Sequence, residues 1–246
     1  MEPILIILVS VAILAVFLWF VFRSPKKIAS MSSPHPKYDE IAGKRSEILS
    51  LSPTTPHECF LKEEVLRFIS IAGTVAQTFP NVATSIDERI LSHIMLRSVI
   101  ENFFKIIYVF DDPSQMTNRF DRILDGFRCD YSKLFNDIDA SFQNQIENPV
   151  AGWNTLQKAP DLKSMLAQVR NTFGTRLDYL YFIYRIGSFD THGNSLNAMF
   201  EAVFAKKCNF PFLQIIPVIE LIADQYLCTI APLLPPATPW GRSEFR

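Results

Sequence analysis

The chain has few glycines, almost no net charge and no paired cysteines. Only 8 of its 246 residues are Gly, whereas 48% are hydrophobic and 21 are Phe, a balance that favours helices over a glycine-rich β fold. A formal net charge of −1 gives no overall positive field that would attract nucleic acid. The 4 cysteines are scattered without a Cys-x-x-Cys pair, so they predict neither a zinc site nor a disulfide framework. We expect an all-α protein whose thiols stay free in a reducing compartment.

Several signatures of catalysis and cofactor binding are also missing. The sequence contains no Gly-x-x-x-x-Gly-Lys-Ser/Thr or Gly-x-Gly-x-x-Gly phosphate loop and no His-Glu-x-x-His metal motif. It has no Gly-x-Ser-x-Gly nucleophile motif, and no cysteine lies in a recognisable catalytic context. We therefore expect no metal ion and no cofactor.

A long uncharged segment lies at the N-terminus. Pro3 to Phe22 carry no charged side chain, and 20 helical residues span about 30 Å, the thickness of the hydrocarbon core of a bilayer. Basic residues follow at once (Arg23, Lys26 and Lys27), which predicts that the C-terminal side lies in the cytoplasm. A cleaved signal peptide would have a basic start and a shorter apolar run. We predict a single-pass anchor in the cell (inner) membrane over residues 1–23.

The composition changes twice after this segment. Residues 24–57 are rich in Ser, Pro and Lys, which predicts a flexible tether, with a short helical piece around Tyr38 to Ser50. Residues 58–236 have the apolar spacing of a helical domain, and residues 237–246 form a tail.

The domain is expected to be a bundle of about five or six helices. The expected helices cover Glu58 to Phe79, Ser85 to Phe110, Pro113 to Ile146, Asp161 to Ile186, Ser195 to Lys206 and Phe212 to Ala231. The last of them is apolar enough to be a second membrane span. Glu220, Asp224 and Gln225 lie in its middle, however, and charged groups are costly inside a bilayer. We interpret this segment as a helix buried in the bundle.

The expected helix 85–110 carries a polar stripe. It consists of His93, Arg97, Glu101 and Lys105. Residues four apart lie on one face of a helix, and Ser98 and Asn102 lie next to that face. One interpretation is a solvated face with ion pairs between successive turns. The other is a functional site.

A second polar group lies in the stretch "YRIGSFDTHGN", residues 184–194. If the helix continues past Arg185, His192 lies on the same face about 10 Å along the axis, but Gly187 and the following residues favour a break. In either case the two side chains can converge on one ligand. A histidine can take a proton from a ribose 2′-hydroxyl and an arginine can hold a phosphate, which suits metal-free attack on a phosphodiester. The structural alternative is an Arg paired with an acid and a His that caps the helix.

Together these motifs resemble those of HEPN domains, the higher-eukaryote and prokaryote nucleotide-binding family. The pattern is Glu-x-x-x-Lys on one helix and Arg-x6-His on a later one, here Glu101, Lys105, Arg185 and His192. "LRSVIENFFKIIYVF", Trp153 and "YRIGSFDTHG" are similar to motifs of a bacterial domain family of unknown function, over residues 86–196. One departure is Ile186, where HEPN nucleases commonly have a polar Asn or Asp.

HEPN domains are all-helical, and many are metal-independent ribonucleases that act as dimers. The resemblance therefore implies a homodimer that acts on RNA. It implies that His192 is the acid/base, that Arg185 binds phosphate, and that Glu101 and Lys105 orient them. The candidate supporting residues are Arg97, Ser98, Asn102, Ser188 and Asp190.

Two functions of different classes remain open. The chain is a membrane-anchored ribonuclease of stress or phage defence, or it is a non-catalytic helical module that binds a partner or oligomerises at the cytoplasmic membrane face. In the second case the same polar residues form a network that fixes the helix register.

Overall fold

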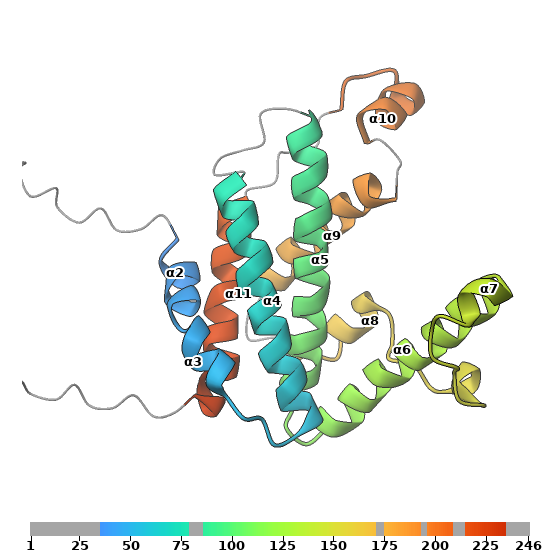
Figure 1. Ribbon diagram of the computed structural model, residues 1–246. Helices are drawn as coiled ribbons and strands as arrows, with labels where there is room; N and C mark the ends of the chain where they lie inside the picture. The colour runs from blue at the N-terminus through green and yellow to red at the C-terminus, as the bar shows by residue number, and fades with distance from the viewer. Residues whose placement is uncertain (1–34, 79–85, 171–174, 193–195, 209–214, 235–246) are drawn as a thin grey trace, which may run out of the picture. The chain divides into compact units, whose positions relative to one another are not determined.

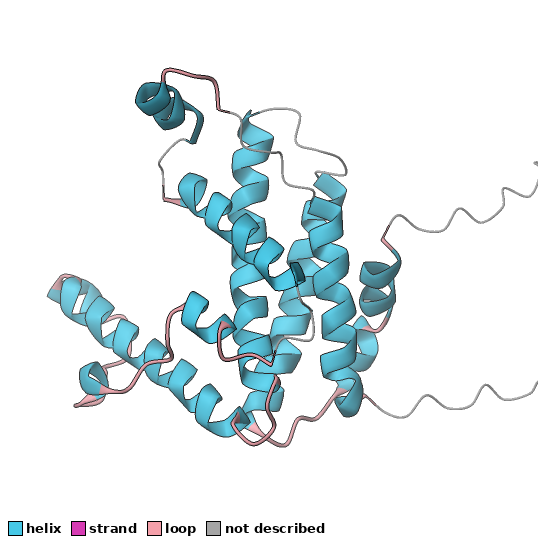
Figure 2. Cartoon of the chain, turned by 180° about the vertical axis from the view of Figure 1, so that it is seen from behind, coloured by secondary structure: helices cyan, strands magenta, loops and turns pink. Residues whose placement is uncertain are grey.

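The computed structural model describes residues 35–78, 86–170, 175–192, 196–208 and 215–234. Within these ranges every regular element is a helix and no strand occurs, so the all-α expectation is confirmed for this part of the chain (Figures 1 and 2). The expected anchor 1–23, the first part of the tether (24–34) and the tail 237–246 lie outside the described residues.

Four helices build the core. They are α4 (Pro56–Thr78), α5 (Ile86–Phe110), α9 (Thr175–Thr191) and α11 (Ile215–Ile230). Helix α5 contacts the other three, and Figure 2 shows α9 crossing it. Ile100, Phe103 and Phe104 of α5 are at most 1% exposed, because apolar residues at helical spacing give α5 one continuous buried face. His93 lies within this buried side and is 2% exposed, whereas Glu101 and Lys105 lie at its edge and are 29% and 31% exposed. The stripe therefore runs from the interface with α9 to the molecular surface.

Further helices lie between these four in the sequence or follow them. They are α6 (Met116–Asp137), α7 (Ala140–Gln143), α8 (Leu162–Leu166), α10 (Leu196–Phe204) and two 3-10 turns, η1 (Trp153–Thr155) and η2 (Ala231–Leu233). The expected helix 113–146 is therefore too long. It ends at Asp137 because Ile138 is extended and the Asp139 carboxylate caps a new turn by accepting from the Ser141 amide at 2.9 Å.

The expected helix 161–186 is two helices in the structure. Asp161 caps α8 by accepting from the Ser164 amide at 3.0 Å, and α8 ends after Leu166. The chain then turns towards the end of α5, where the Arg170 amide donates to Asp111 at 2.8 Å and its guanidinium to Asp112 at 2.9 Å. The apolar spacing continues across this break because both pieces pack on the same core, so the periodicity alone predicts one helix.

Residues 36–50 are not part of a flexible tether. They form α2 (Pro36–Gly43) and α3 (Arg45–Ser50), and Ile41 and Ile48 are 0% exposed. The folded unit therefore begins at His35 rather than at residue 58. The short helical piece expected around Tyr38 to Ser50 is present as these two helices, but its assignment to a flexible tether is wrong. Two isoleucines within a polar stretch are too few to produce a periodic signal of burial.

Helix α11 holds α2 in place. Its Glu220 carboxylate accepts from the Lys37 amide at 2.9 Å and from the Tyr38 amide at 3.0 Å, so it caps the start of α2 from another helix. Asp224 lies 3.3 Å from the Lys37 ammonium, and the Tyr38 hydroxyl donates to the Ile69 carbonyl of α4 at 2.9 Å.

Residues 215–233 are the one described segment with the length and composition of a membrane span. The helix packs against α2, α4 and α5, and Val218, Ile219, Ile222 and Tyr226 are at most 1% exposed. Its acidic residues bind α2 rather than face lipid. We therefore interpret α11 as the buried helix that its central charges predict.

We expect Glu220→Ala to lower the free energy of unfolding by about 1–2 kcal/mol, because two amides at the start of α2 lose their acceptor. Hydrogen exchange should be faster at the Lys37 and Tyr38 amides, and urea unfolding should occur at lower denaturant. Glu63→Ala, at an exposed position of α4, is the matched control and should change neither. Unchanged exchange at Lys37 and Tyr38 would contradict this role of Glu220.

Candidate functional site

The polar stripe of α5 forms ion pairs along its own helix. Glu101 lies between two cations, 3.0 Å from the Lys105 ammonium and 3.7 Å from the Arg97 guanidinium. All three side chains are between 19% and 31% exposed. These are the pairs between successive turns that the structural interpretation of the stripe predicts, and exposed pairs of this kind contribute little to stability.

Arg97 also connects α5 with α9. Its Nε donates to the Ser188 hydroxyl at 3.1 Å, and its Nη2 donates to the Tyr184 hydroxyl at 3.4 Å. The guanidinium carbon lies 5.2 Å from the centre of the Tyr184 ring, within the range of a cation–π contact. The Ser188 hydroxyl in turn donates to the Tyr184 carbonyl at 2.8 Å. Arg97 therefore fixes the side of α9 that carries Tyr184 and Ser188.

His93 and Asp190 form a buried pair deeper in the same interface. Nδ1 of His93 lies 2.7 Å from Oδ2 of Asp190, and the two side chains are 2% and 0% exposed. This contact joins the first half of α5 to the last turn of α9. A polar pair with so little access to water fixes how the two helices meet, because neither group finds an equivalent partner if they slide.

Gly187 lets α5 and α9 approach at this point. A Cβ atom built on Gly187 would lie 3.1 Å from the His93 carbonyl oxygen and 3.4 Å from Cβ of Arg97. The first distance is too short for an unstrained contact, and the nearest neighbour is backbone, which cannot rotate away. The glycine that sequence reasoning associates with a break in the helix is instead a packing residue within it.

We expect Gly187→Ala to lower the free energy of unfolding by about 1–2 kcal/mol, because the added methyl group forces α5 and α9 apart. Gly126→Ala in α6 is the control, since no atom lies within 4 Å of its added Cβ. That variant should raise stability by up to about 1 kcal/mol through helix propensity. Urea unfolding of both variants measures the difference, and a stabilising Gly187→Ala would show that the close contact is unimportant.

Arg185 and His192 lie on the exposed side of α9. The helix continues through Thr191, so the expected break near Gly187 is wrong, and the His192 amide donates to the Ser188 carbonyl at 3.2 Å. Seven residues are nearly two turns, which places the two side chains on one face about 10 Å apart along the axis. Both residues are exposed. Within the described residues, no hydrogen bond or ion pair joins Arg185 to Glu101, and Glu101 contacts Arg97 and Lys105 instead.

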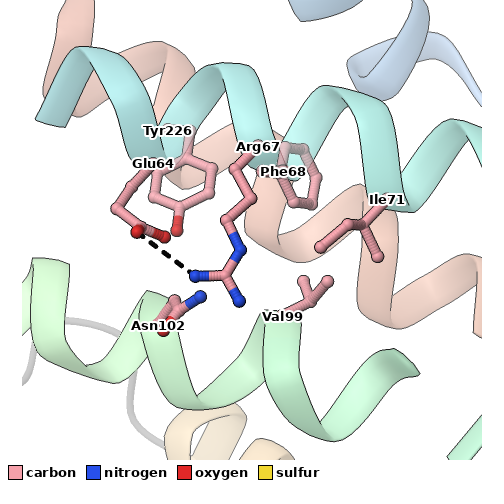
Figure 3. Close-up of a pocket in the computed structure, with 7 residues that line it drawn as sticks. All are labelled: Glu64, Arg67, Phe68, Ile71, Val99, Asn102 and Tyr226. Atoms are coloured by element: carbon pink, nitrogen blue, oxygen red, sulfur yellow. Dashed lines mark hydrogen bonds and ion pairs between the residues drawn. The ribbon is translucent and has the colours of Figure 1, made fainter. Parts of the chain in front are cut away.

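Ser98 and Asn102 face α4 rather than α9. The Ser98 hydroxyl accepts from Nη2 of Arg67 at 2.9 Å, and Arg67 lies 3.4 Å from Glu64. Figure 3 shows the Arg67 side chain between Glu64 and Asn102, with Tyr226 beside them. The hollow that these groups line leaves no volume for a water molecule. Burial raises the pKa of the Glu64 carboxyl, which Arg67 partly opposes, and burial also raises the pKa of the Tyr226 hydroxyl.

A larger polar groove of about 670 Å³ adjoins this hollow. Its walls come from α4, α5, α6, α8 and α9, and Phe60, Phe127 and Tyr184 supply aromatic surface. Its charged lining residues are Glu64, Arg67, Arg97, Glu101, Lys105, Asp130, Lys158 and Asp161. Four are acidic and four basic, and each of the four cations forms an ion pair with an acid of the groove. The groove is therefore polar but nearly neutral.

The structure separates the candidate residues into two groups. Arg97, Glu101, Lys105 and Asn102 line the polar groove, whereas Arg185 and His192 are exposed and are not among its lining residues. Ser188 of α9 accepts a hydrogen bond from Arg97 of the groove. Asp190 is buried against His93 and does not reach the groove surface. Among the described residues no group of three or more His, Cys, Asp or Glu side chains is arranged to hold a metal ion.

Comparison with protein-family models, with curated proteins and with solved structures finds no match for this chain. The part of the chain that the structure describes is an all-helical fold with a polar interface between α5 and α9.

Proposed function

We propose that the chain is a membrane-anchored, HEPN-like protein that binds and cleaves RNA without a metal ion, with Arg185 and His192 as the reacting pair. The observation that carries the proposal is the continuity of α9, which gives these two residues one exposed face. The last turn of this helix is held by the buried His93–Asp190 pair and by Arg97. A reacting pair needs such a rigid support, because small displacements lower rates strongly.

The proposed chemistry uses these two side chains, the substrate and a second group that donates a proton to the leaving oxygen. The Arg185 guanidinium binds the phosphate and stabilises its developing charge. His192 accepts the proton of a ribose 2′-hydroxyl, whose oxygen attacks the phosphorus and displaces the 5′-oxygen of the next nucleotide. The products are a 2′,3′-cyclic phosphate and a 5′-hydroxyl. In this scheme Arg97 positions α9, and Glu101, which also pairs with Lys105, holds Arg97 in orientation.

A homodimer would supply the second proton transfer. One His192 cannot accept a proton and donate another in the same step, so the 5′-oxygen takes its proton from a second group. Phe182 and Phe189 are each 45% exposed and lie three residues before and four after Arg185. Aromatic side chains on this face favour an interface between two copies, which would bring two His192 residues together.

In this proposal the anchor holds the activity at the cytoplasmic side of the cell (inner) membrane. The support is the uncharged segment 3–22 and the basic residues that follow it. A ribonuclease held there acts on RNA of its own cell, which suits a role in stress or phage defence.

Cleavage of a labelled single-stranded RNA by the full chain, with EDTA present, tests the proposal. Arg185→Ala should lower the rate about a hundredfold, as loss of one charge-stabilising donor typically does. Arg176→Ala is the control, because Arg176 is also exposed on α9 but lies more than two turns away. Equal loss in both variants would assign the effect to general charge and contradict a phosphate site at Arg185.

The polar groove favours a second candidate, a non-catalytic binding module. Every Arg and Lys that lines it is already paired with an acid, so it offers little net attraction to a polyanion. It suits a neutral or zwitterionic ligand. RNA that stays intact with the folded wild-type protein would favour this function.

A further inference from the structure

Helix α10 exposes an unusual amount of apolar side chain for its length. Met199, Val203 and Phe204 are 54%, 71% and 58% exposed in a helix that covers only Leu196–Phe204. At 100° per residue they lie on one side together with Phe200, whose ring is 4.7 Å from that of Phe204. The opposite side is formed by small and polar residues. The helix is therefore amphipathic, and its apolar side is exposed.

Basic residues follow this apolar side directly. Ala205 has a φ of 49°, which ends the helix, and Lys206 and Lys207 are both exposed. Glu201 is the one acidic residue between 196 and 208. Aromatic and aliphatic side chains next to lysines are the composition of helices that lie in the interface of a membrane. There the apolar face enters the acyl boundary and the lysines remain among anionic headgroups.

The length of the chain before the folded unit favours a bilayer as the occupant. The folded unit begins at His35, and only residues 24–34 separate it from the proposed anchor. Eleven extended residues reach about 40 Å at most, so the folded unit stays within about its own diameter of the membrane. This step rests on the proposed anchor. Exposed apolar patches in water are usually covered, and the proposed anchor keeps a lipid surface within reach of the folded unit that carries this patch.

We propose that α10 binds the interface of an anionic bilayer, with Met199, Val203 and Phe204 in the acyl boundary and Lys206 and Lys207 among the headgroups. The folded unit is then attached at two points, the anchor and α10. Two attachments fix its orientation relative to the membrane, whereas the anchor alone leaves it free to rotate.

The test uses the full chain reconstituted in vesicles of phosphatidylcholine with or without phosphatidylglycerol. An environment-sensitive fluorophore is attached to Val203→Cys, in a background in which Cys59, Cys208 and Cys228 are serine. With lipid-borne quenchers in the anionic vesicles, its emission should shift to the blue and lose about half its intensity, as expected for insertion at the acyl boundary. A label at Ala198→Cys, on the opposite side of α10, should be quenched much less.

A second variant tests the charge. Lys206→Glu combined with Lys207→Glu should remove most of the quenching at position 203. Emission that shifts to the blue without quenching would mean that protein, such as a second copy, covers α10, and would overturn the proposal. Emission that is neither shifted nor quenched would overturn the proposal as well.

Flotation of the same vesicles reports the anchor separately. A chain that does not float after alkaline washing lacks the anchor, which removes the argument from distance and overturns the α10 proposal with it. A chain that floats without quenching overturns the α10 proposal alone. RNA cleavage in the same preparation is an independent readout of the proposed function.

Discussion

Asp190→Ala should lower the free energy of unfolding by about 3 kcal/mol, the largest effect on stability that we expect from a single polar residue here. The reason is the burial of its partner, since His93 and Asp190 are 2% and 0% exposed at their side chains and lie 2.7 Å apart. Removing the carboxylate leaves the Nδ1 atom of His93 facing a small cavity. Urea unfolding of the full chain in detergent, followed by circular dichroism, measures the change.

Two further variants separate this contact from general damage to the core. Asp190→Asn keeps an oxygen acceptor of the same shape and should lose clearly less stability than Asp190→Ala. In a double-mutant cycle with His93→Ala, the two losses should be far from additive, with a coupling of about 1–3 kcal/mol. Additive losses would mean that the pair contributes no more than its separate packing.

His192→Ala should lower the rate of RNA cleavage by a factor of about 10²–10⁴, the usual contribution of a general acid or base. Since His192 is exposed at the end of α9, the free energy of unfolding of this variant should differ from that of the wild type by no more than about 0.5 kcal/mol. Rates with a labelled RNA and unfolding curves of the same preparation give both numbers. A variant that keeps the wild-type rate would remove His192 from the proposed chemistry.

The two variants lie close together in the sequence but should differ in kind. Asp190→Ala acts on the fold, and any loss of cleavage should follow its loss of stability. His192→Ala acts on the reaction and leaves the fold unchanged. This contrast tests whether α9 has one buried supporting side and one exposed reacting side.

Long helices with a strong apolar period were the most predictable part of the fold. The end of α5 at Phe110 follows from the Asp-Asp-Pro sequence after it, and the burial of α11 follows from Glu220 and Asp224. The split between α8 and α9 was not predictable, because it depends on Asp111 and Asp112 holding Arg170 from a distant part of the chain. Local spacing contains no information about such a contact.

The polar residues of the candidate site were easier to find than their partners. The four-residue spacing of the α5 stripe was visible in the sequence, and so was that of Tyr184, Ser188 and His192, although Tyr184 was not selected. The contact of Arg97 with Ser188 depends on how α5 and α9 cross, and that crossing depends on Gly187. Sequence spacing assigns residues to a face of a helix, whereas the packing of the core decides which faces meet.

The most direct measurement is a product analysis with the wild-type full chain. A short oligoribonucleotide and its 2′-deoxy counterpart are incubated with the protein in EDTA, and the products are identified by mass spectrometry. The account predicts cleavage of the ribonucleotide to fragments with 2′,3′-cyclic phosphate and 5′-hydroxyl ends, and an intact deoxynucleotide, because the 2′-oxygen is the nucleophile. An intact ribonucleotide, or equal cleavage of both substrates, would contradict a ribonuclease built on Arg185 and His192.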